Sequence, residues 1–308
     1  MSPDVIQAIL LTVVTAATPL LIAAMGELVV ERSGVLNLGV EGMMIIGAVT
    51  GFGAAQITGS PWAGVLAAII CGALFSLPFA VLTLSLATNQ VATGLSLTLL
   101  GLGVAGMIGE QFVGLPGVRL EAVNVPFLVD IPLIGRLLFG QDPIFYLSIG
   151  LAVGVWWFIF RTRAGLTLRA VGDSHGSAHA LGINVLRVRY LAVMFGGACA
   201  GLAGAHLSLV YIPQWVENMT AGRGWIALAL VVFASWLPLR VVIGAYLFGA
   251  VTIAQFHAQA QGVAIPSQLL SALPYLATIV VLVLISSNRR MTMGNTPASL
   301  GKPFVPDR

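Results

Sequence analysis

The strongest constraint on this chain is that long stretches of it contain no charged residue. Between Gly42 and Gly109 there is no Asp, Glu, Lys or Arg. Charged residues make up 8% of the whole sequence and hydrophobic residues 58%, whereas a water-soluble domain carries about 25% charged residues. Such a chain cannot cover a water-facing surface, which excludes a cytosolic globular enzyme. The composition predicts an all-α fold, a polytopic bundle of transmembrane helices.

The apolar stretches set the expected number of crossings. A hydrocarbon core about 30 Å thick requires about 20 apolar residues per helix. We expect about nine spans; eight or ten are alternatives because Ile57–Ala63 and Gln259–Ser267 are ambiguous. The expected spans are Val5–Gly26, three within Gly42–Gly109, Pro143–Phe160, Tyr190–Val216, Trp225–Leu239 and two within Val241–Asn288. Residues 1–288 then form a single transmembrane domain, and residues 289–308 a cytoplasmic tail.

Basic residues predict the orientation of the bundle. Segment 161–189 contains one acidic residue, Asp173, and the basic residues Arg161, Arg163, Arg169, Arg187 and Arg189. The tail after Ser286 adds Arg289, Arg290, Lys302 and Arg308. Cytoplasmic loops of membrane proteins are enriched in Lys and Arg, so we expect the N-terminus outside and the C-terminus in the cytoplasm. The net charge of +3 is too small to indicate a nucleic-acid partner.

Two short motifs suggest chemistry that their surroundings do not support. Gly172–Gly176 matches G-x-S-x-G, but it lies in a short loop between predicted spans, not on a strand-to-helix turn. His175 and His179 are four positions apart, but no glutamate follows the first histidine and no third ligand is near. We therefore predict neither a catalytic residue nor a metal site. The sequence also has no Walker A motif, so ATP would have to be hydrolysed by another polypeptide.

Glycines four positions apart are typical of close packing between transmembrane helices. Such pairs include Gly47/Gly51, Gly150/Gly154 and Gly197/Gly201. Because glycine is abundant in this chain, we take the pairs only as an indication that the bundle is compact. Two inverted halves are expected, with Gly39–Gly109 corresponding to Gly224–Ser286.

Four stretches carry a specific resemblance. They are Glu31–Met44, Asn89–Gly94, Arg169–Val185 and Gly224–Thr278. In this order, over residues 15 to 287, the chain resembles the membrane permease subunits of bacterial ABC importers for nucleosides. These subunits belong to the wider group of ribose and branched-chain amino-acid permeases. The short sequence before the first helix is similar to the nucleoside branch.

The resemblance implies a transport subunit without an ATPase site, which works by alternating access in the cytoplasmic (inner) membrane. It implies three protein partners: an ABC ATPase subunit that holds ATP and Mg²⁺, a second permease subunit, and an extracytoplasmic substrate-binding protein. The second permease is a copy of this chain or a related one, and this chain binds no cofactor itself. A ribose-like sugar is the alternative solute. An ion-coupled secondary transporter is a further alternative, but such carriers usually need intramembrane carboxylates, for which only Glu27 is a serious candidate.

Polar residues beside the apolar runs are candidates for the substrate path. Asn37 and Glu41 interrupt two apolar runs, and broken helices are where transporters commonly place substrate contacts. An ordinary cytoplasmic turn is the alternative. Asn89 and Gln90 offer uncharged amides to a polar, neutral solute, or they satisfy helix ends. Glu27 is expected to be neutral or to pair with Arg32.

The segment after Arg169 predicts a short cytoplasmic helix over Ser174–Leu181. Asp173 or Ser174 can cap its start, and Gly182 suits a left-handed position at its end. The resemblance implies that this is the coupling helix, which docks into a groove on the ATPase subunit. An amphipathic loop without a partner is the alternative. The candidate coupling residues are Ser174, His175, Ala178, Leu181 and Gly182.

Overall fold

A computed structural model describes residues 3–123, 126–129, 131, 134–260 and 295–305, with isolated positions between 266 and 283. The α-helices are α1 Pro3–Arg32, α2 Val40–Thr58, α3 Pro61–Ala80, α4 Gln90–Gly109, α5 Ile134–Phe139, α6 Pro143–Arg161, α7 Arg163–Asp173, α8 His175–Ala180, α9 Val185–His206, α10 Arg223–Phe233 and α11 Pro238–Ala260. Three short η helices, η1 Val81–Ser85, η2 Glu110–Phe112 and η3 Leu207–Tyr211, extend α3, α4 and α9. The described ranges contain no strand. The all-α prediction is confirmed.

Seven helices of the described ranges are long and apolar enough to cross a membrane. They are α1, α2, α3 with η1, α4 with η2, α6, α9 with η3, and α11. The predicted span Trp225–Leu239 contains the short helix α10, whose 11 residues extend about 16 Å, too little to cross a membrane alone. Most of the predicted last span, in the second half of Val241–Asn288, lies outside the described residues.

Glycine allows α2, α3 and α9 to pack with their backbones in contact. A Cβ atom on Gly47 would lie 2.4 Å from Gly201 Cα, and one on Gly72 would lie 2.3 Å from Gly197 O. Only hydrogen fits at such distances, so a larger residue would force these helices apart. The predicted pair Gly150/Gly154 makes no such close contact, because a Cβ at either position would meet nothing within 4 Å. That pair does not pack within the described part of the chain.

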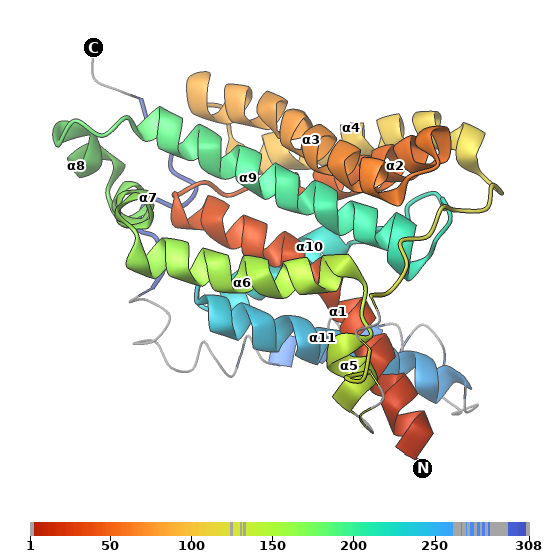
Figure 1. Cartoon of the computed structure of the whole chain (residues 1–308). Helices are drawn as coiled ribbons and strands as arrows, with labels where there is room; N and C mark the ends of the chain where they lie inside the picture. Colours follow the sequence, from red (N-terminus) through yellow and green to blue (C-terminus); the bar gives the residue numbers. More distant parts are fainter. Residues whose placement is uncertain are drawn as a thin grey trace.

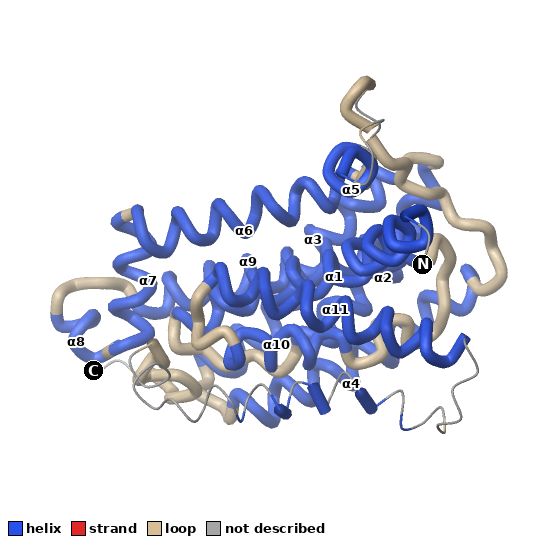
Figure 2. The backbone as a smooth tube through the Cα atoms, turned by 90° about the horizontal axis from the view of Figure 1, so that it is seen from below, coloured by secondary structure: helices blue, strands red, loops and turns tan. Residues whose placement is uncertain are grey.

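The two ends of the bundle are distinct (Figure 1). Helices α7 and α8 and residues 295–305 gather at the end of α1 that carries Arg32. Arg32 Nη1 donates a hydrogen bond to Asn295 O at 3.1 Å, and Gly172 lies against Arg32 O. We call this the α8 end. The N-terminus of α1 lies at the opposite end, and the view in Figure 2 again separates α8 from the N-terminus along the bundle.

Two chain segments enter the bundle as irregular backbone and become helices inside it. Residues 33–39 lead inward from the α8 end, and α2 begins where Gly42 lies against the Leu97 carbonyl, well inside α4. Residues 212–222 lead inward from the opposite end, and α10 begins beside the start of α2, with Gly224 against the Glu41 backbone. Irregular backbone at such depth requires protein around it or a water-filled cavity. A role of this region in substrate contacts stays a prediction.

Candidate functional site: two broken helices and the α8 module

Glu41 joins the two broken helices. Its Oε1 accepts hydrogen bonds from Thr220 Oγ1 (2.5 Å) and Gly222 N (2.8 Å), and its Oε2 accepts one from Gly224 N (2.6 Å). The first amides of a helix have no partner within the helix and carry its positive dipole end. A carboxylate is the natural acceptor for them. Glu41 is 3% exposed and holds the starts of α2 and α10 together.

Asn37 and Glu27 organise the backbone before α2. Asn37 Oδ1 accepts a hydrogen bond from Gly39 N at 3.0 Å, and Glu27 Oε1 accepts one from Asn37 N at 3.3 Å. Glu27 Oε2 has no hydrogen-bond partner among the described residues. Both side chains are buried. They lie inside the protomer, where they stabilise irregular backbone.

Arg32 does not form the pair with Glu27 that was one of our expectations. Its Nε and Nη2 both donate to Trp236 O, at 3.2 and 2.8 Å, and Nη1 donates to Asn295 O. Trp236 Nε1 in turn donates to Glu31 Oε2 at 2.5 Å. The last turn of α1 is thus bonded to the segment that follows α10. A backbone carbonyl oxygen outside a helix lacks the usual hydrogen-bond donor, and burying it without one is costly. The guanidinium of Arg32 supplies this donor.

Asn89 and Gln90 have different surroundings at the start of α4. Asn89 caps the helix, since its Oδ1 accepts from Ala92 N at 3.0 Å, and its side chain remains exposed. Gln90 is buried, and its Oε1 accepts from Leu36 N at 2.8 Å. Gln90 Nε2 has no hydrogen-bond partner within the described ranges. The α8 end of α4 is therefore attached to residues 33–39.

The predicted short helix is present as α8. Ser174 caps it, with Oγ accepting from Ser177 N at 3.3 Å, and Gly182 ends it at φ +83°. The helix is six residues long, shorter than the predicted Ser174–Leu181. Ala178 is 2% exposed and faces a local apolar cluster, whereas Leu181, just past the end of α8, is 82% exposed. Of the five candidate coupling residues, Ala178 is therefore buried against the protein and Leu181 is available to a partner.

Residues 295–305 pack against α7 and α8. Ser299 N donates to Gly172 O at 2.8 Å, and Gly301 N donates to Gly34 O at 3.1 Å. Phe304 lies against both imidazoles, at ring-centroid distances of 5.2 Å from His175 and 5.4 Å from His179. It completes an apolar cluster with Val171, Ala178 and Val185. We call α7, α8 and residues 295–305 together the α8 module.

Arg189 connects the α8 module to residues 33–39. Its side chain is fully buried; Nε donates to Ser33 O at 3.1 Å and Nη1 to Lys302 O at 3.4 Å. Nη2 lies 3.2 Å from His175 Nδ1. Partial burial, together with the positive charges of Arg189 and Lys302, lowers the pKa of His175 below its ordinary value. The neutral imidazole can therefore accept this hydrogen bond.

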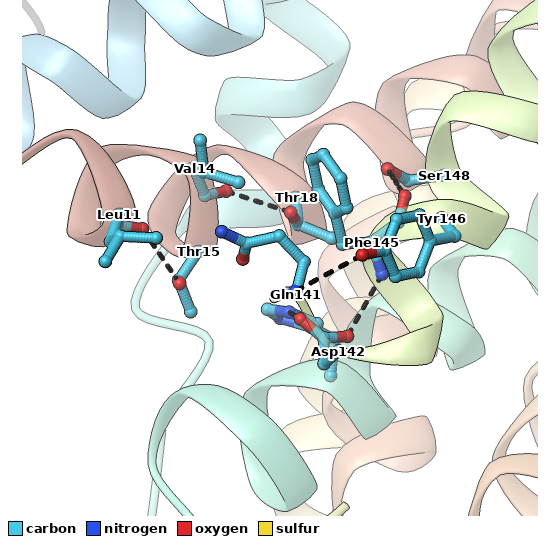
Figure 3. Close-up of polar contacts among 10 residues, drawn as sticks. Leu11, Val14, Thr15, Thr18, Gln141, Asp142, Phe145, Tyr146 and Ser148 are labelled. Atoms are coloured by element: carbon cyan, nitrogen blue, oxygen red, sulfur yellow. Dashed lines mark hydrogen bonds and ion pairs between the residues drawn. The ribbon is translucent and has the colours of Figure 1, made fainter. Parts of the chain in front are cut away.

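A second polar contact lies at the opposite end, at the start of α6 (Figure 3). Asp142 Oδ1 accepts from Phe145 N at 3.0 Å and caps α6, and Oδ2 lies 3.6 Å from His206 Nε2. Burial alone would raise the pKa of Asp142. The imidazole of His206, whose Nε2 lies 3.6 Å from Oδ2, and the amides of Phe145 and Ile144 outweigh that effect and lower the pKa of Asp142. This contact joins the start of α6 to the end of α9.

Sequence reasoning missed several residues of this site. Thr220, Trp236 and Arg189 were assigned no contact, and residues 295–305 were expected only as a tail. Glu41 was expected in the substrate path, and one sequence signal could have indicated its actual contact. An acid followed directly by glycine at the start of an apolar run is typical of a contact with a helix terminus. No comparable local signal exists for the others, because their partners lie far away in the sequence.

Comparisons with known protein sequences show the family of this chain. A family model described as the branched-chain amino acid transport system permease component matches residues 9–286. The chain belongs to this permease family. A putative glucose ABC transporter permease protein of Haloferax volcanii is 43% identical over 292 residues, which cover 87% of this chain and 88% of the relative.

Two further relatives carry nucleoside names. A nucleoside ABC transporter permease protein of Lactococcus lactis is 34% identical over 294 residues, covering 91% of this permease and 93% of the relative. A guanosine ABC transporter permease protein of Bacillus subtilis is 35% identical over 267 residues, covering 80% and 82%. The resemblance inferred from the sequence is confirmed. The chain is a multi-pass membrane permease subunit of an ABC transporter.

Proposed function

We propose that this permease imports nucleosides across the cytoplasmic membrane by alternating access, powered by a separate ATPase subunit that docks on the α8 module. An extracytoplasmic binding protein delivers the solute, and a second permease subunit completes the path. The observation that carries the choice of solute is the pair of relatives named as nucleoside and guanosine permeases, matched over 91% and 80% of this chain. A sugar is the second candidate, because the relative at 43% identity is named as a putative glucose permease.

The distribution of charge supports placing the α8 end in the cytoplasm. The basic residues described at or near that end are Arg32, Arg161, Arg163, Arg169, Arg187, Arg189, Arg240 and Lys302. Those of the connection between η2 and α6, at the opposite end, are Arg119 and Arg136. The remaining described one, Arg223, begins α10 and lies over the Tyr211 ring. This asymmetry follows the positive-inside rule. The N-terminus is then external and residues 295–305 are cytoplasmic.

An exposed polar stripe on α4 supports a path along that helix. Asn89 caps α4, Glu110 follows it in η2, and Ser96 and Gly103 lie between them at seven-residue spacing, about two helical turns. All four are exposed, as are the apolar side chains of Leu99 and Met107 of the same helix. Polar groups of a transmembrane helix face a bundle interior or a water-filled cavity rather than lipid. We infer that the stripe lines the path and that the second permease subunit faces it. Asn37, Glu41 and Gln90 contribute by positioning the broken helix beside α4.

A continuous set of contacts supports coupling between α8 and this path. Ser33 O accepts from Arg189, Gly34 O accepts from Gly301, and Leu36 N donates to Gln90 at the start of α4. A movement of the α8 module would therefore displace residues 33–36 and the start of α4. ATP binding changes the equilibrium only through contacts that differ between the two states of the permease. The exposed Leu181 is the apolar side chain that the ATPase subunit would bury.

The test is transport by the reconstituted complex. The permease is purified with the ATPase, second permease and binding protein encoded beside its gene, and uptake of labelled guanosine, adenosine and glucose into vesicles is measured. We expect ATP-dependent uptake of both nucleosides, no competition by excess glucose, and no uptake when the P-loop lysine of the ATPase subunit is replaced. Accumulation of glucose without nucleosides would favour the sugar alternative. Uptake driven by an ion gradient without ATP would contradict the importer function.

A further inference from the structure

A large apolar groove lies between α6 and α9, and residues of α1 and α7 complete its lining. Figure 1 shows how these four helices are arranged. Its volume is about 750 Å³, and its walls include the exposed side chains of Leu147 and Leu191 and, on α6, Gly150 and Gly154. Thr167 is the single polar residue among those that line it, and its hydroxyl donates to Arg163 O at 3.0 Å. Apart from this hydroxyl, the lining has no polar side chain that could bind a polar solute. It suits a hydrocarbon chain.

Basic side chains surround the α8 end of the groove. Arg163 lies one helical turn before the lining residue Thr167, and Arg187 one turn before the lining residue Leu191. Each arginine therefore shares a helix face with a lining residue and lies one turn beyond it. Both arginines are exposed. Arg161, at the end of α6, is also exposed and lies over the Trp156 ring at 5.8 Å. An apolar groove that ends in cations matches an acyl chain attached to an anionic headgroup.

Acidic residues do not neutralise this cluster. The one acid of segment 161–189 is Asp173, which lies at the far end of α7 from Arg163. Juxtamembrane arginines attract anionic lipids by about 1 kcal/mol each, which for two arginines corresponds to about thirtyfold selectivity over a zwitterionic lipid. The charge and the apolar groove thus favour the same ligand independently.

A helix of the second permease subunit or of the C-terminal part of this chain is a less suitable occupant of the groove than a lipid. The polar stripe proposed to face the second permease subunit is on α4, which packs on α2 and α3, whereas α6 packs on α1, α7 and α11. Ala277, a described position of the C-terminal part, lies beside Leu230 and Gly244 of α10 and α11. Neither observation directs a protein helix into the groove. We propose that the groove between α6 and α9 is a binding site for one anionic phospholipid, whose acyl chain lies along Gly150 and Gly154 and whose phosphate contacts Arg163 and Arg187.

Native mass spectrometry of the purified permease tests the site. The protein is equilibrated with mixed micelles that contain equal amounts of phosphatidylglycerol and phosphatidylcholine, and the bound lipids are counted. We expect one retained phosphatidylglycerol, with selectivity of about thirtyfold. The double variant Arg163→Gln/Arg187→Gln should bind both lipids equally, because the groove remains and the charge is lost. Gly154→Leu should retain neither lipid, because its side chain enters the groove.

A charge-matched control uses arginines of the opposite end. Arg119→Gln/Arg136→Gln removes two exposed cations there and should leave the selectivity unchanged. Equal loss in this control, or equal retention of the two lipids by the unmodified permease, would overturn the proposal. A cysteine at position 154 provides a second test in membranes. Efficient disulfide formation between two Gly154→Cys chains would mean that the groove is an interface between copies and would overturn the lipid site.

Discussion

Glu41→Ala is expected to abolish uptake and to lower the free energy of unfolding by about 3–9 kcal/mol. The carboxylate accepts from Thr220 Oγ1, Gly222 N and Gly224 N, and each buried donor left without a partner costs about 1–3 kcal/mol. A loss of this size approaches the total stability of a typical domain, about 5–15 kcal/mol. Thermal unfolding in detergent and uptake by the reconstituted complex would both be measured.

Two further variants separate the role of the carboxylate from a general effect of losing a charge. Glu41→Gln retains one carbonyl oxygen but directs an amide N–H toward another donor, so we expect uptake near that of Glu41→Ala. Glu121→Ala removes an exposed acid from the loop after η2 and should change neither stability nor uptake. If Glu41→Ala transports normally, the two broken helices are not held together by this side chain.

The second large effect is expected for Arg189→Ala. This variant leaves Ser33 O, Lys302 O and His175 Nδ1 without their common donor and opens a cavity at a fully buried position. Each buried acceptor left without a donor costs about 1–3 kcal/mol. We expect residues 295–305 to become sensitive to protease, and the solute transported per ATP hydrolysed to fall at least tenfold. Coupling, rather than ATPase activity alone, is the informative measurement.

Arg189→Lys and Arg240→Ala are the matched variants. A lysine keeps the charge, but its ammonium group lacks the planar set of N–H donors with which arginine reaches three acceptors. We therefore expect Arg189→Lys to recover coupling only in part. Arg240 lies at the same end of the bundle on α11 and is partly exposed; its removal should leave both protease resistance and coupling intact. Normal coupling in Arg189→Ala would show that the contacts from the α8 module to residues 33–36 do not transmit movement.

Short-range sequence patterns predicted those features of the site that depend on neighbouring residues, such as helix caps. Ser174 and Gly182 were expected to begin and end a short helix, and they cap α8 on both sides. Asn89 was expected either to contact solute or to satisfy a helix end, and it caps α4. Charge-free stretches located the long spans for the same reason, because hydrophobic length depends on neighbouring residues alone.

Contacts between distant segments could not be predicted in this way. Arg32 and Asn295 are 263 positions apart, and Arg189 and Ser33 are 156 apart. One sequence contains no record of such pairs, so Arg189 counted only as a cytoplasmic charge. The span Trp225–Leu239 was overestimated for a related reason. Its apolar residues satisfy a hydropathy window, but the helix, which starts at Arg223, already ends at Phe233, with irregular backbone on both sides.

The most direct test of the account is the sidedness of Leu181. A Leu181→Cys variant is prepared in a background with Cys71 and Cys199 replaced by serine and alanine, respectively, and is treated with a membrane-impermeant thiol reagent. We predict labelling in inside-out vesicles only, and protection of the thiol when the ATPase subunit is bound. Labelling of intact cells from the outside, or equal labelling with and without the bound ATPase subunit, would contradict docking of the ATPase on the α8 module.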